Sequence, residues 1–116
     1  MELKIMAVHL LTKTPAKLLE SFKEAIKKGR VVTWAYDADG DFTHTPEQWK
    51  NAAWFRPAIQ SGRLVMRIVK PQGKILTREV YGIYHGRIIE SISIHCHTFF
   101  SEAFSTAEPT SEDILS

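Results

Sequence analysis

The Asp39–Gly40 pair limits the possible folds of this chain more than any other feature, because it separates two segments with the composition of strands. Residues 31–38 are rich in β-branched and aromatic side chains, and residues 41–45 continue after the pair. Both central positions of a two-residue hairpin turn need a positive φ, which Asp and Gly tolerate. The sequence therefore predicts an antiparallel hairpin at this point.

A two-residue loop also fixes which side chains lie opposite one another. The expected pairs are Ala38 with Asp41, Tyr36 with Thr43 and Ala35 with His44. In this register His44 lies over a small side chain and has free space beside it.

The N-terminal third predicts a strand followed by a helix. Residues 3–11 are an apolar run too short for a typical helix, which favours a buried strand. Thr14 is a good N-cap, Pro15 suits the first helical position and Gly29 suits the left-handed C-terminal stop. Apolar residues recur between them at helical spacing, namely Leu18, Leu19, Phe22, Ala25 and Ile26.

A second helix and a second hairpin are expected in the middle of the chain. Residues 45–48 (Thr-Pro-Glu-Gln) form a helix start, and Pro57 predicts that this helix ends near Phe55. Residues 63–70 then predict a strand that turns at residues 71–73 and returns to about residue 84. The expected pairs are Ile68 with Leu76, Val69 with Ile75 and Leu64 with Val80.

Residues 87–104 fit two secondary structures. Seven apolar residues fall on one helical arc, whereas the β-branched and serine content fits a strand, and we favour the helix. Residues 105–116 predict a flexible tail after a single globular domain of residues 1–104. The resulting fold class is α+β, with a mainly antiparallel sheet, helices packed on one face and the order β-α-β-β-α-β-β-α.

Composition indicates a small protein of the reducing cytoplasm. The chain has 116 residues, one of which is cysteine, so no internal disulfide can form. No apolar run reaches the roughly 18 residues of a membrane span, and the N-terminus does not resemble a signal peptide. Residues 1–104 hold all 15 Lys and Arg against 10 Asp and Glu, a formal charge of +5. That mild excess is compatible with an anionic partner and with a plain solvated surface.

The strongest candidate binding site lies in residues 81–87. Gly82 and Gly86 would allow close approach of a ligand to the backbone, in what we expect to be a strand-to-helix connection. If a helix begins at residue 87, its free N–H groups and the Arg87 guanidinium would attract an anion. The expected ligand-binding residues are Tyr84, His85, Arg87 and Glu90.

The acidic turn is a second candidate site. Asp37, Asp39, Asp41 and His44 could hold a hard metal ion such as Mg²⁺ or Mn²⁺, although the calcium-loop pattern fails because Gln48 stands where that loop needs Glu. The simpler interpretation is a solvated turn whose aspartates make local hydrogen bonds. Weak catalytic candidates are Asp41, His44 and His85.

No tightly bound metal ion or cofactor is expected in this chain, because the aspartate cluster lacks a bidentate terminal ligand and the histidines lack partners. His95 and His97 would share a face only on a strand, and no further cysteine completes a zinc set. Cys96 is expected to be buried rather than nucleophilic, and no Gly-x-Ser-x-Gly elbow occurs.

Residues 33–49, 84–87 and 89–90 resemble a group of small bacterial proteins without an assigned function. This resemblance implies a bacterial cytoplasmic protein, and it implies no activity or catalytic residue.

Two functional hypotheses remain open. The first is a non-enzymatic module that binds an anionic small molecule, protein or nucleic acid. The second is a small metal-assisted or acid/base hydrolase that uses the aspartate cluster. Proximity of His44 and His85, within about 10 Å, would favour an enzyme.

Overall fold

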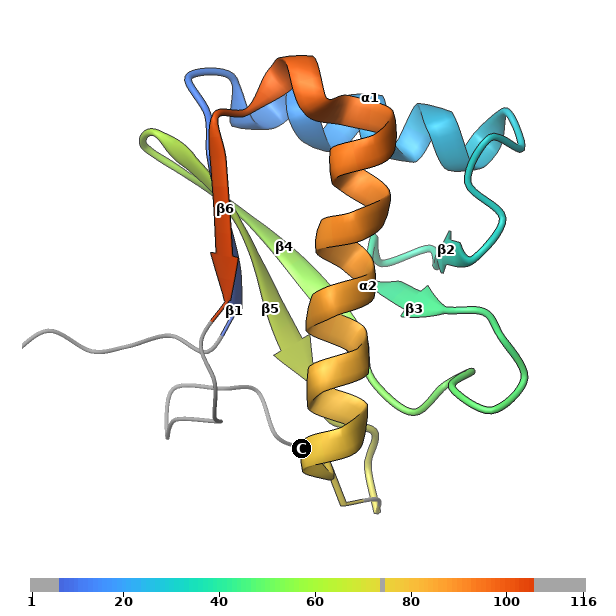
Figure 1. Cartoon of the computed structure of the whole chain (residues 1–116). Coiled ribbons are helices and arrows are strands. Elements are labelled where there is room, and N and C mark those ends of the chain that lie inside the picture. Colours follow the sequence, from blue (N-terminus) through green and yellow to red (C-terminus); the bar gives the residue numbers. More distant parts are fainter. Residues whose placement is uncertain (1–6, 74, 106–116) are drawn as a thin grey trace, which may run out of the picture.

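The computed structural model describes residues 7–73 and 75–105, which form a sheet with two helices (Figure 1). The elements are β1 (Ala7–Leu11), α1 (Pro15–Lys27), β2 (Trp34–Tyr36), β3 (Phe42–His44), β4 (Trp54–Gln60), β5 (Arg63–Val69), α2 (Arg78–Cys96), the short 3₁₀ helix η1 (His97–Phe99) and β6 (Glu102–Ser105). All strand pairs are antiparallel, in the order β2-β3-β4-β5-β1-β6. The α+β class is therefore confirmed, whereas the predicted order of elements is wrong.

The first helix begins and ends where the sequence predicts. Pro15 occupies the first helical position, and Gly29 follows the helix with φ +77°. The predicted cap is wrong in one detail, because the Thr14 side chain makes no capping hydrogen bond. Instead the Thr14 N–H donates to the hydroxyl of Thr12, 3.0 Å away. The apolar stripe of α1 is buried through Leu18, Phe22 and Ala25, as its spacing requires.

One face of the sheet packs with both helices to form the core. Alternate strand residues share this face, because side chains alternate along a strand. In Figure 1, α2 runs lengthwise in front of the strands, and α1 crosses its upper end. The strand residues of the core are Val8, Leu10, Trp34, Phe42, Phe55, Leu64, Met66 and Ile68, and α2 contributes Tyr81, Tyr84, Ile88, Ile92 and Cys96. Cys96 is buried, as expected.

The predicted hairpin at the Asp39–Gly40 pair exists, but its register differs by one residue. Observed pairs are Trp34 with His44, Ala35 with Thr43 and Tyr36 with Phe42. The loop contains three residues rather than two, because the Asp37 N–H donates to the Asp41 carbonyl and the Gly40 N–H donates to the Asp37 carbonyl. Gly40 takes the positive φ, +83°. This shift places His44 opposite a tryptophan instead of an alanine.

The helix predicted from residue 45 to residue 55 is wrong. A single turn forms, in which the N–H groups of Trp49 and Lys50 donate to the Pro46 carbonyl. Asn51 then has φ +60°, which ends the turn. The Thr45 hydroxyl donates to the Val32 carbonyl instead of capping a helix. Residues 54–60 pair with β5, and this long-range pairing outweighs a local helix signal.

The second hairpin joins β5 to the strand before it, not to the segment after it as predicted. β4 and β5 pair over their full length, from Trp54 with Val69 to Gln60 with Arg63, through a tight turn at residues 61 and 62. Gly62 supplies the positive φ. Pro57 is tolerated because β3 pairs with β4 only at Phe55, and no other described strand pairs with that edge of β4.

The C-terminal helix both begins and ends earlier in the chain than the predicted range of residues 87–104. The Thr77 hydroxyl accepts a hydrogen bond from the Val80 N–H, so α2 begins at Arg78. Residues 102–105 instead form β6, which pairs with β1. The pairs predicted between residues 64–69 and 75–80 are wrong, because β4 and β1 occupy both sides of β5. Of the predicted tail only Ser105, in β6, lies within the described residues.

Candidate functional site

Tyr84 and His85, which were expected to bind a ligand, lie in the protein interior instead. Both belong to the buried side of α2. The helix begins nine residues before residue 87, so its N–H groups there already bond within the helix and cannot hold an anion. The helix-start argument for anion binding at this position is therefore wrong.

His85 is buried as a neutral side chain. Its Nδ1 donates to the Tyr81 carbonyl at 2.8 Å, and its ring stacks on that of Tyr81. Burial lowers the pKa of His85 to about 4, and the hydrogen bond to Tyr81 only partly opposes this shift. Nε2 is buried and has no hydrogen-bond partner among the described residues. A side chain that is 2% exposed cannot contact a partner from solution.

Arg87 and Glu90 lie on the opposite, exposed side of α2. Nη1 of Arg87 lies 3.3 Å from a carboxylate oxygen of Glu90, one helical turn along. Such a surface pair contributes little to stability or recognition. The four predicted ligand-binding residues are thus divided between the core and a self-neutralised surface pair.

His44 is also part of the buried aromatic cluster. Its Nδ1 donates to the Thr33 carbonyl at 2.7 Å, and its ring packs 4.6 Å from that of Trp34. Burial is the main cause of its lowered pKa, to which the charge of Arg87 on α2 adds. The free space predicted beside His44 is absent, because the observed register fills it with tryptophan.

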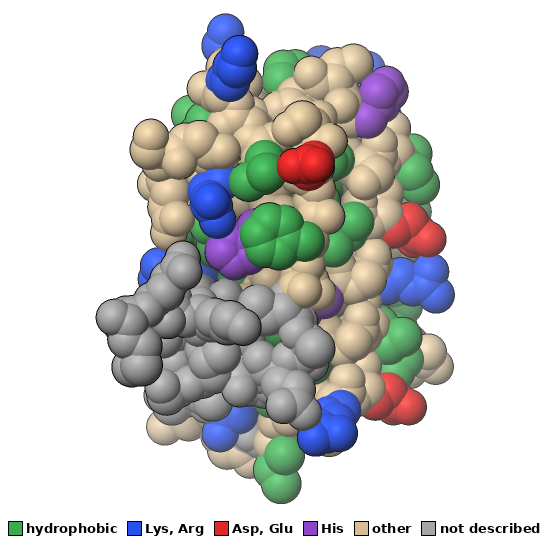
Figure 2. Space-filling view, turned by 60° about the vertical axis from the view of Figure 1, so that its left-hand side comes forward, with side chains coloured by type: hydrophobic (Ala, Val, Ile, Leu, Met, Phe, Trp, Pro, Cys, Tyr) green, Lys and Arg blue, Asp and Glu red, His purple; other side chains and the backbone are tan. Residues whose placement is uncertain are grey.

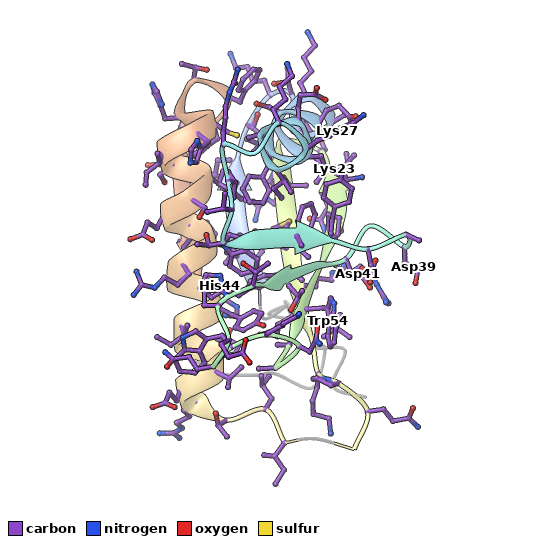
Figure 3. The ribbon with its side chains drawn as sticks, turned by 90° about the vertical axis from the view of Figure 1, so that its right-hand side faces the viewer. Lys23, Lys27, Asp39, Asp41, His44 and Trp54 are labelled. Carbon is purple, nitrogen blue, oxygen red and sulfur yellow. The ribbon has the colours of Figure 1, made fainter. Side chains whose placement is uncertain are left out.

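The predicted acidic cluster is dispersed. Asp37 accepts hydrogen bonds from the N–H groups of Asp39 and Asp41, as in an ordinary aspartate turn. Both oxygens of Asp41 accept from the Arg56 guanidinium, at 3.1 and 3.0 Å. Figure 3 shows Asp39 and Asp41 on the side of the molecule away from α2, and His44 beside α2. In the described part of the chain, no three His, Cys, Asp or Glu side chains are arranged to hold a metal ion.

The two histidines of the competing sites, His44 and His85, are linked by packed aromatic rings of the core and do not face a common pocket. The His44 ring contacts the Tyr84 ring, which contacts Phe55, whose ring lies 5.1 Å from His85. The space between them is filled by aromatic side chains. Proximity of this kind builds a core and leaves no room for a substrate.

The sheet face turned away from the helices holds a further set of charged and aromatic side chains, most of them half-buried. We call it the outer face. It consists of the residues of four strands that alternate with the core residues, namely Trp54, Arg56, Ala58 and Gln60 on β4, Arg63, Val65, Arg67 and Val69 on β5, Ala7, His9 and Leu11 on β1, and Glu102 and Phe104 on β6. Among the described residues, three arginines and one glutamate carry its charge.

Arg67 lies near the middle of the outer face, beside a second arginine. Its cross-strand neighbours are Arg56 on β4 and Ala7 on β1. The Nε atom of Arg67 is buried and has no hydrogen-bond partner among the described residues. Sequence reasoning missed this group, although the alternation of Arg63, Val65 and Arg67 already places both arginines on one side of a strand.

Aromatic side chains lie at two places on the outer face. The rings of His9 and Phe104 stack at 4.7 Å, and Arg63 donates to Nδ1 of His9 at 3.2 Å. Phe104 remains 46% exposed. Trp54 is half-buried and precedes Arg56 by two residues on the same face of β4. Figure 2 looks toward the β6 edge, where described basic, acidic, histidine and hydrophobic side chains gather.

A separate hollow of about 350 Å³ lies between the start of α1 and the segment after α2. Residues 11–14 and 98–101 line it. The Thr12 hydroxyl inside it donates to the Phe99 carbonyl, so this polar group is already used within the protein.

Comparison of the chain with known protein families, with curated proteins and with solved structures found no match in any of the three. The resemblance to small bacterial proteins therefore stays a hypothesis. No helix in the described residues is long and apolar enough to cross a membrane.

Proposed function

We propose that this protein is a non-enzymatic binding module for an anionic partner, and that the partner binds on the outer face. The observation that supports the proposal is the half-buried side chain of Arg67, which lies beside a second arginine and whose buried Nε atom has no hydrogen-bond partner among the described residues. This location replaces the one expected around residues 84–90.

An unpaired cation of this kind costs free energy. Burial removes part of the water around Arg67, and the nearby guanidinium of Arg56 repels it. Asp41 offsets the charge of Arg56. Both carboxylate oxygens of Asp41 are bonded to Arg56, so Asp41 does not serve Arg67 as an acceptor. A carboxylate or phosphate between Arg56 and Arg67 would supply the missing acceptor, and arginine binds both groups in a two-pronged geometry.

The geometry supports the hydrolase hypothesis less well. Asp37 is occupied by its own turn and Asp41 by Arg56, whereas His44 is buried at the other end of β3. A general base must reach the proton that it removes, and none of these three groups faces a shared cavity.

Inorganic triphosphate titrated into ¹⁵N-labelled protein tests the proposal. We expect the side-chain Nε–H resonance of Arg67 and the β4 and β5 amides to shift. The affinity should fall as salt rises, because exposed charges are screened. Arg67→Ala should abolish most of the shift, whereas Arg30→Ala, which removes the same charge at an exposed position in the segment after α1, should leave it unchanged.

Shifts confined to residues 84–90 would overturn the proposal and return the site to α2. Binding that Arg30→Ala weakens as much as Arg67→Ala does would also overturn it, because such binding would depend on net charge alone. Melting temperatures of both variants separate a loss of binding from a loss of folding.

A further inference from the structure

The outer face combines cations with partly exposed aromatic rings, and this combination limits the class of partner that the face can bind. One group joins Trp54 with Arg56 and Arg67, and another joins Arg63 with the stacked rings of His9 and Phe104. Each group thus holds a planar apolar surface next to a guanidinium.

The spacing of the two groups follows from the strand register. A row of paired residues crosses the sheet from Ala58 through Val65 and His9 to Phe104. Trp54 lies four residues along β4 from this row, so strand geometry separates Trp54 from Phe104 by about 20 Å. Val65, in the middle of the row, is buried, so a partner would contact the two groups rather than a continuous flat surface.

Three classes of anion can be compared with this arrangement. An inorganic phosphate or an acidic peptide would satisfy the arginines but has no use for two separated rings. A nucleic-acid duplex offers phosphates, but its bases are already stacked on each other and cannot stack on protein rings. A single strand offers both, because its bases stack on aromatic side chains while its phosphates bind arginine.

We propose that the outer face binds single-stranded nucleic acid, with bases stacked at Trp54 and at the Phe104–His9 pair and phosphates bound by Arg56, Arg63 and Arg67. This inference rests on the proposed function, which requires only that the face binds an anion. A span of about 20 Å corresponds to a few nucleotides, in keeping with sheets that stack two or three bases.

Fluorescence anisotropy of labelled ten-nucleotide oligouridine and oligothymidine, with the full chain, tests the proposal. We expect binding of at least one single strand, and at least tenfold weaker binding of a duplex of the same length. Phe104→Leu should weaken binding of the single strand about tenfold, and Trp54→Leu by a similar factor. Arg67→Ala should reduce the slope of log affinity against log salt by about 0.7.

Phe99→Leu provides the matched control for Phe104→Leu. Phe99 is also a partly exposed phenylalanine close to the C-terminus of the described chain, but it belongs to η1 rather than to the outer face. We expect this variant to bind like the unsubstituted protein. Triphosphate binding by Phe104→Leu and Trp54→Leu should also be unchanged, which shows that the arginines are still in place.

Failure of this inference and failure of the proposed function give different results. If triphosphate binds at Arg67 but the aromatic variants bind the single strand as tightly as the unsubstituted protein, this inference is wrong and the proposed function stands. If neither triphosphate nor a single strand shifts the Arg67 resonance, both are wrong. Preference for the duplex, or for an acidic peptide over every oligonucleotide, also overturns the inference.

Discussion

The Tyr84 hydroxyl donates a hydrogen bond to the Trp49 carbonyl across 2.5 Å and ties α2 to the loop between β3 and β4. The same oxygen lies 3.1 Å from the Thr43 hydroxyl and 3.4 Å from the backbone nitrogen of His44. One buried phenol thus satisfies polar groups from the loop and from β3, in a segment with little regular structure of its own.

Tyr84→Phe should lower the free energy of unfolding by about 1–3 kcal/mol, because it removes the hydrogen bonds of the buried phenol to the Trp49 carbonyl and the His44 N–H. Urea denaturation measures this change. Tyr36→Phe is the control, since Tyr36 is partly exposed and should lose less than about 0.5 kcal/mol. Equal losses in the two variants would show that the Trp49 bond has no special role.

Stability should fall with acidification because of His85. Its pKa is lowered to about 4 in the folded protein, against about 6.5 in the unfolded chain, so the unfolded chain binds the extra proton first. The contribution is complete above pH 6.5 and is lost as the pH falls toward 4, about 3 kcal/mol in all. His85→Phe should flatten this part of the stability profile. His95→Gln, at an exposed position of α2, should not change it.

Two glycines in α2 should be replaceable with a gain in stability. Gly82 and Gly86 are exposed within the helix, and an added Cβ at either position would meet no atom within 4 Å. Gly82→Ala and Gly86→Ala should each raise the free energy of unfolding by about 0.5–1 kcal/mol. Gly62→Ala should have the opposite effect, since Gly62 has φ +77° in the β4–β5 turn. Thermal melting of the three variants checks all of these signs.

Asp41→Asn should strengthen anion binding by several-fold. The substitution removes the carboxylate that is bonded to Arg56 and frees this guanidinium for the partner. Asp39→Asn removes an equal charge from the same turn without releasing Arg56, so triphosphate affinity should change less. Equal gains would mean that only net charge matters.

Divalent cations should have no effect on stability. Both oxygens of Asp41 are bonded to Arg56, and Oδ1 of Asp37 is bonded to the backbone of its turn, so the described residues offer no group of three ligands to an ion. The melting temperature should be the same in excess Mg²⁺ or Mn²⁺ as in a chelator. A rise that Asp41→Asn abolishes would revive the metal-site hypothesis.

The local signals of this sequence determined the elements whose ends are set by neighbouring residues. Pro15 and Gly29 bound α1, and its apolar spacing selects the buried side. The Asp39–Gly40 turn forms where predicted, since its backbone conformation depends on those few residues. The α+β class follows from the same information.

Tertiary pairing decided the rest. Residues 45–55 carry a helix start, yet the pairing of β4 with β5 leaves them a single turn. A hairpin of two seven-residue strands gains more from burial than a short helix gains from its cap. Gly82 and Gly86 disfavour a helix locally, and the packing of Tyr84 and Ile88 outweighs this cost.

The candidate site was beyond sequence reasoning for the same reason. The sequence shows polar and titratable side chains around position 85, but α2 begins before this segment and places His85 on its buried side. Conversely, Arg67 becomes a candidate binding residue only because β4 places Arg56 beside it and β1 brings His9 toward Arg63. Local sequence determined which segments could form each element and each turn. Which side chains meet depended on long-range strand pairing, because burial and charge neutralisation involve residues far apart in the chain.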